Sequence, residues 1–106
     1  MSASDQLRAG LSALPGVAQA PSRIGSERSP AWFVGSREFA HLHSDSLLDL
    51  RLPQPLQARL RNDPRAHFRR NSSAWLELEF RTAQDVADLL RLARQAAAAA
   101  KRRGAK

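Results

Sequence analysis

Alternation of apolar and polar side chains predicts a series of strands in this chain. The clearest is 74–81, where large apolar residues occupy every second position. Residues 37–52 alternate in the same way on both sides of the polar sequence Ser44-Asp45-Ser46, which is typical of a hairpin. The short apolar run 31–34 is followed by a Gly-Ser turn signal, so we expect it to pair with 38–43 in a first hairpin.

The register of the second hairpin follows from keeping one of its faces apolar. With 44–46 as the turn, that face consists of Ala40, Leu42, Leu48, Leu50 and Leu52. The other face pairs Phe39 with Arg51, His41 with Asp49, and His43 with Leu47. Glu38 is expected opposite Leu52, beside the apolar set, because side chains alternate strictly along a regular strand. The polar side chains of 74–81, together with Trp75, are expected to share the face of the histidines.

Capping signals predict a helix near each end of the chain. Ser2 and Asp5 form a capping box, and leucines on one helical face follow it until a Pro-Gly pair ends the helix. Thr82 and Asp85 form a second capping box that opens a long helix. The alanines 96–100 favour that helix but offer little surface to bury.

The remaining segments carry turn signals. Pro53 and Pro55 end the second hairpin and start a short helix. The sequence 62–64 stops that helix, and 64–73 is expected to form an arginine-rich loop. Between the first helix and the first hairpin, Arg23-Ile24 is the candidate for a short strand.

This order of elements predicts an α+β fold in two layers. N-terminal, short middle and long C-terminal helices would cover one face of an antiparallel sheet of about four to five strands. Residues 1–100 are expected to form a single domain, because 106 residues suffice for one modest core. Residues 101–106 are expected to form a basic, frayed tail.

Composition narrows the class of protein. The chain has no cysteine, which excludes disulfides and thiolate metal sites. It has no apolar run of transmembrane length and no basic-then-apolar leader. We therefore expect a cytoplasmic protein without a membrane partner.

The net charge of +7 is concentrated at one end of the chain, because the last 16 residues contain six basic side chains and no acidic one. A basic helix end is what the helix dipole favours. Nucleic-acid binding through this tail and the arginine loop, which includes Arg69 and Arg70, is therefore only the weaker alternative.

Candidate chemistry is concentrated in the second hairpin. His41 and His43 are two residues apart on one strand and Asp49 faces His41, so the three could hold a divalent metal ion. His67 in the arginine loop is a candidate third nitrogen ligand. His41 beside Asp49 could also serve in acid–base catalysis, although no nucleophile and no flavin or nucleotide motif accompanies them.

Because no complete catalytic constellation can be assembled, the pattern favours a non-catalytic binding or interaction module over an enzyme. Its sheet face would bind an anionic or aromatic small ligand or a partner protein, or form a homodimer. The candidate ligand-binding residues are His41, His43, Asp49, Arg51, His67, Arg69, Arg70 and Trp75. A small metal-dependent or acid–base enzyme using His41, His43 and Asp49 is the alternative.

The blocks Phe39-Ala40-His41-Leu42-His43-Ser44-Asp45 and 48–53, then His67, then 75–78 and a helix over 82–92, also carry a resemblance. They resemble the small bacterial domain family called luciferase-like, whose role is not established, over about residues 23–95. The element order is similar to the MmcQ/YjbR-like fold. The resemblance implies that the positions matching the family's recurrent residues are His41, His43, Asp49, His67 and Trp75.

Overall fold

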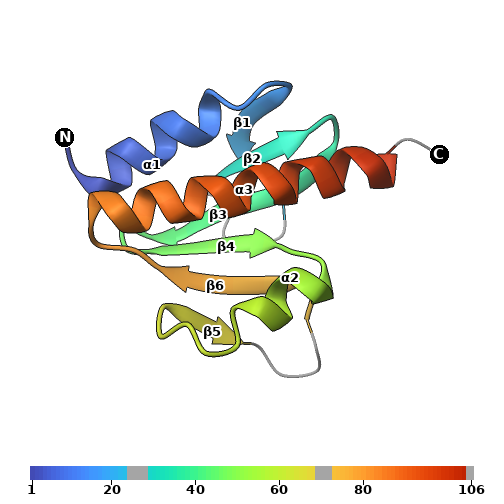
Figure 1. The fold of residues 1–106 in the computed structure, drawn as a ribbon. Coiled ribbons are helices and arrows are strands. Elements are labelled where there is room, and N and C mark those ends of the chain that lie inside the picture. The colour runs from blue at the N-terminus through green and yellow to red at the C-terminus, as the bar shows by residue number, and fades with distance from the viewer. Residues whose placement is uncertain (24–28, 69–72, 105–106) are drawn as a thin grey trace.

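The structure, a computed structural model, describes residues 1–23, 29–68 and 73–104. It confirms an α+β fold in two layers, with two helices lying across one face of an antiparallel sheet (Figure 1). The helices are α1 (Ala3–Ser12), α2 (Gln54–Arg59) and α3 (Ala83–Gly104). The strands are β1 (Val17–Pro21), β2 (Pro30–Val34), β3 (Arg37–Ser44), β4 (Leu47–Arg51), β5 (Ala66–Phe68) and β6 (Trp75–Glu79).

Among the described residues, the sheet has six strands in the order β1-β2-β3-β4-β6-β5, one more than the upper end of the expected range. The sequence prediction missed both edge strands, β1 and β5. β1 precedes the predicted Arg23-Ile24 strand, and Arg23 itself lies outside any strand, while Ile24 falls outside the described residues. β5 lies inside the predicted 64–73 loop. Both strands are short and mostly exposed, so they lack the alternation of a half-buried strand.

The centre of the second hairpin has the predicted register, since Ala40 pairs with Leu50 and His41 with Asp49. Its end does not: a bulge after Leu42 makes Ser44, rather than His43, the partner of Leu47. A bulge inserts one extra residue into a strand and re-aims the side chains beside it. The expected position of His43 opposite Leu47 is therefore wrong.

A second bulge in β3 corrects the expected positions of Phe39 and Glu38. Trp32 pairs with Ala40, whereas Phe33 pairs with Glu38, so Phe39 is the extra residue. Phe39 is completely buried in the main core, and Glu38 contacts His41 on the opposite face. The prediction had these two side chains reversed, because it assumed uninterrupted alternation.

The core lies between the sheet and the helices α1 and α3. The Ser2 and Thr82 caps form as expected, each hydroxyl accepting a hydrogen bond from the backbone N–H three residues on. Ala96, Ala99 and Ala100 are buried, so the alanine run faces the protein interior although each side chain offers little surface to bury. Small side chains let α3 lie close to the sheet, and the helix continues through Gly104.

Within the described ranges, no helix combines the length and the apolar character needed to cross a membrane.

Candidate functional site

The face of the sheet opposite α1 and α3 carries a row of polar side chains across adjacent strands. The strand pairings place His41 on β3 beside Asp49 on β4, Asp49 beside Glu77 on β6, and Glu77 beside His67 on β5. Cross-strand neighbours on one face lie close enough to interact. The predicted sharing of a face by the histidine, the aspartate and the polar side chains of β6 is consistent with these pairings.

His41 is held between two carboxylates. Its Nδ1 lies 2.9 Å from Oε2 of Glu38, and its Nε2 lies 2.8 Å from Oδ2 of Asp49. The side chains of His41, Glu38 and Asp49 are only 5%, 2% and 0% exposed, respectively. Both ring nitrogens are therefore occupied by short, buried contacts, and with both protonated the imidazolium can donate to each carboxylate.

Burial and the two neighbouring carboxylates have opposite effects on the charge of His41. Burial, the largest of them, lowers the pKa of His41, but the hydrogen bonds and negative charges of Asp49 and Glu38 together outweigh it. The net pKa of His41 is raised above its usual 6.5. The contacts thus favour a positively charged ring between two buried negative groups.

Neighbouring segments cover His41 and the two carboxylates that contact it. Oε2 of Glu38 accepts a hydrogen bond from the Ser22 hydroxyl at 2.7 Å, and Oε1 accepts one from the Arg23 backbone N–H at 2.7 Å. The Trp75 ring lies 4.9 Å from the His41 ring, centre to centre, and Trp75 is 9% exposed. The residues just after β1 and the start of β6 thus shield His41 from water.

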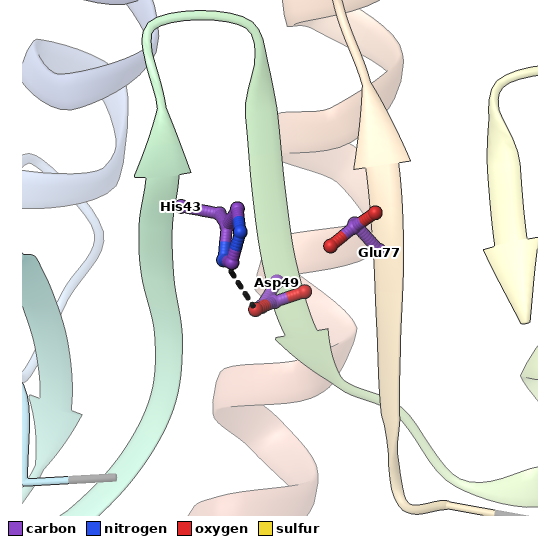
Figure 2. A group of neighbouring side chains, drawn as sticks. All are labelled: His43, Asp49 and Glu77. Atoms are coloured by element: carbon purple, nitrogen blue, oxygen red, sulfur yellow. Dashed lines mark ion pairs between the residues drawn. The ribbon is translucent and has the colours of Figure 1, made fainter. Parts of the chain in front are cut away.

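A more open group lies beside this buried chain. Figure 2 shows His43, Asp49 and Glu77 on three strands, with the histidine and the glutamate flanking the aspartate. One ligand atom from each lies within 4.8 Å of those of the others. Nδ1 of His43 is 3.9 Å from Oδ2 of Asp49, and the His43 side chain is 57% exposed. The three side chains could close around a metal ion after small rotations of the two outer residues.

The other candidate residues lie in different surroundings. His67 is exposed and pairs with Glu79 at 3.0 Å, so it does not join the group in Figure 2. Arg51 lies at the end of β4, where its charge acts on Arg103 of α3. The positions of Arg69 and Arg70 fall outside the described residues.

Two acidic residues of this face were not among the sequence candidates. Glu38 was expected beside the apolar set, and Glu77 was included only among the polar side chains of 74–81. The signal for Glu38 was present: a charged residue beside a strand's apolar set is rarely buried without a partner. Finding that partner required the bulge at Phe39, which the sequence pattern did not reveal.

The fold and this face define the class of protein: a small α+β domain whose open sheet face carries a buried carboxylate–histidine–carboxylate chain. The Luciferase domain family profile matches residues 36–96, a span that contains β3, β4, α2, β5, β6 and the start of α3. The chain belongs to the Luciferase domain family. No curated protein and no solved structure matches it.

Proposed function

We propose that the domain is a non-catalytic binding module whose open sheet face binds a divalent cation through His43, Asp49 and Glu77. The observation that carries this proposal is the convergence of these three side chains from adjacent strands within 4.8 Å (Figure 2). One imidazole and two carboxylates suit a first-row divalent ion such as Zn²⁺ or Mn²⁺. Three protein ligands leave positions open for an anionic small ligand.

The buried neighbours of Asp49 support this assignment. Asp49 is completely buried and its Oδ2 lies 2.8 Å from Nε2 of His41, which Glu38 holds from the other side. Groups that hold a ligand's side chain in place are typical of metal sites. Asp49 is therefore fixed before any ion arrives, and only His43 and Glu77 need to move.

The charge of the face also favours a cation. Glu38, Asp49 and Glu77 bring three carboxylates to it, and a protonated His41 offsets only one of them. An anion placed directly beside these carboxylates would be repelled. A bound cation would remove that repulsion, so we place the anionic ligand on the ion rather than on the bare sheet.

The contacts of His41 disfavour acid–base catalysis by this residue. A general acid or base must come within hydrogen-bond reach of its substrate. His41 is 4% exposed and both of its nitrogens contact carboxylates. This is why we favour a binding role over the acid–base alternative.

The test is titration of the metal-depleted protein with ZnCl₂ and with MnCl₂ by calorimetry. We expect one ion per chain, and at least about tenfold weaker binding in both His43→Ala and Glu77→Gln, since each removes a ligand. The matched controls are His67→Ala and Glu79→Gln, which remove an exposed His–Glu pair of the same chemistry on β5 and β6. Equal losses in the control variants, or none in the site variants, would contradict the proposal.

A further inference from the structure

The C-terminal end of α3 lies over one end of the central strands (Figure 1). Arg37 opens β3 and Arg51 closes β4. Because β3 and β4 are antiparallel neighbours, these two arginines lie at the same end of the sheet. The last turn of α3 adds Arg102 and Arg103 at this end. Four arginines from three separate elements thus gather there, and we call them the arginine cluster.

Arg103 lacks a partner for part of its guanidinium group. Its Nε and Nη2 atoms are buried, and neither has a hydrogen-bond partner in the described part of the chain. Both nitrogens are obligatory donors, since arginine keeps its proton in proteins. A buried donor left unsatisfied is destabilising, and more so when the group is charged. Such a group calls for an acceptor that the described residues do not supply.

The charges around Arg103 increase the need for an anion. Burial, and then the positive charges of Arg51, Arg37 and Arg102, lower the pKa of Arg103. Every one of these influences opposes its positive charge. The contrast with Arg65 is informative, because that side chain contacts three aspartates and its pKa is raised.

We propose that the arginine cluster is a binding site for a phosphate-class oxyanion, with Arg103 as the central donor. A guanidinium group presents its donors as a planar fork that matches two oxygens of a phosphate. Several arginines around one point favour a dianion over a carboxylate, because phosphate carries about 1.5 to 2 negative charges at neutral pH. The anion would supply the acceptors that Arg103 lacks and reduce the repulsion among the four side chains.

This site is separate from the proposed cation site. Arg37 and His43 lie six positions apart on β3, which corresponds to about 20 Å along a strand. The two proposals rest on different residues and use probes of opposite charge. Either can fail without affecting the other.

The test is calorimetric titration with inorganic phosphate at low ionic strength, against sodium chloride of the same ionic strength. We expect saturable binding of one phosphate per chain and a rise in melting temperature that chloride does not produce. Arg103→Met keeps most of the aliphatic stem and removes the fork, so we expect binding to weaken at least about tenfold. Its melting temperature without phosphate should equal or exceed that of the wild type, because a buried, unpaired charge has been removed.

The matched control is Arg94→Met, which removes the same charge from an exposed position of α3. It should retain phosphate binding. If Arg103→Met does not fold, Arg37→Gln replaces it as the test variant, since Arg37 is exposed and contributes charge without a buried contact. Equal binding by the test and control variants, or a response to phosphate no larger than to chloride, would overturn the proposal.

Phenyl phosphate, as a second probe, distinguishes the source of the anion. Binding as tight as that of inorganic phosphate supports a site for phosphate monoesters. Loss of binding with the ester, while inorganic phosphate still binds, supports a site for the free ion. Failure of both probes refutes the site.

Discussion

Arg65→Met removes a positive charge that joins three aspartates near the start of β5 and the start of α3. The Arg65 guanidinium contacts Asp63 at 2.8 Å, Asp85 at 2.9 Å and Asp88 at 3.0 Å. Its Nε makes a further bond of 3.0 Å to Asp63. Methionine retains most of the aliphatic stem, so the change isolates the charge and its hydrogen bonds.

The size of the effect follows from the exposure of these groups. The Arg65 side chain is 28% exposed and the three aspartates are between 19% and 24% exposed. A fully exposed ion pair contributes about 0.2–1 kcal/mol, whereas geometrically good networks contribute more. With a two-pronged contact to Asp63 and single contacts to the other two, we expect the free energy of unfolding to fall by about 2 kcal/mol at neutral pH.

The loss should shrink in acid. Hydrogen bonds from Arg65 are the largest influence lowering the pKa values of Asp63 and Asp88. Backbone N–H groups of Arg81 and Thr82, and then Arg65, lower the pKa of Asp85 from 3.8 to about 2. Carboxyls with lowered pKa values stabilise the fold above their unfolded pKa and lose that contribution as the pH falls through the folded pKa. The network therefore stabilises the wild type near pH 7 and loses its effect toward pH ~2.

The assay is urea denaturation, followed by tryptophan fluorescence, at about pH 7 and about pH 2.5. The lower pH lies below the unfolded pKa of the aspartates, so most of their contribution to the free energy of unfolding is lost there. Arg61→Met, in the exposed turn after α2, is the matched control and should change the free energy by less than about 0.5 kcal/mol. An equal loss at both pH values would show that packing, rather than charge, explains the effect. A loss no larger than that of the control would refute the network's role.

Two further predictions concern stability. His41→Gln leaves Glu38 and Asp49 buried without the charge between them, so we expect a loss of about 3–5 kcal/mol by urea denaturation, and a loss below about 1 kcal/mol would contradict a buried ion pair. Thr82→Ala removes the hydroxyl that accepts a 3.0 Å bond from the Asp85 backbone N–H. It should lower the free energy of unfolding by about 1 kcal/mol, whereas Thr82→Ser should restore most of it.

The central strands and both main helices could be predicted from the sequence because each bears a strong local signal. Capping boxes at Ser2 and Thr82 marked the helix starts, and alternation in β6 marked a half-buried strand. The edge strands bear no such signal. β5 has only three residues, and its extended conformation depends on pairing with β6. Nothing in its own sequence therefore distinguishes it from a loop.

The candidate site was predicted only in part, because its geometry depends on the two bulges. The pairing of His41 with Asp49 followed from the apolar register of the hairpin, and the structure has it. Glu38 could not be placed beside His41 by strict alternation, since residues three apart on a regular strand point to opposite faces. Only the extra residue at Phe39 brings both side chains to the same face.

These bulges support a functional interpretation of this face. The pairing of β3 is interrupted once on each side of His41. The interruption at Phe39 lies in its pairing with β2, and the one at His43 lies in its pairing with β4. Bulges disrupt the hydrogen-bond ladder locally and are frequent next to functional sites, where they re-aim side chains. The first bulge brings Glu38 to His41. The second bulge lies at His43, whose ring is near Asp49. The two interruptions thus lie on either side of His41, and they are consistent with the cation site that we propose for this face.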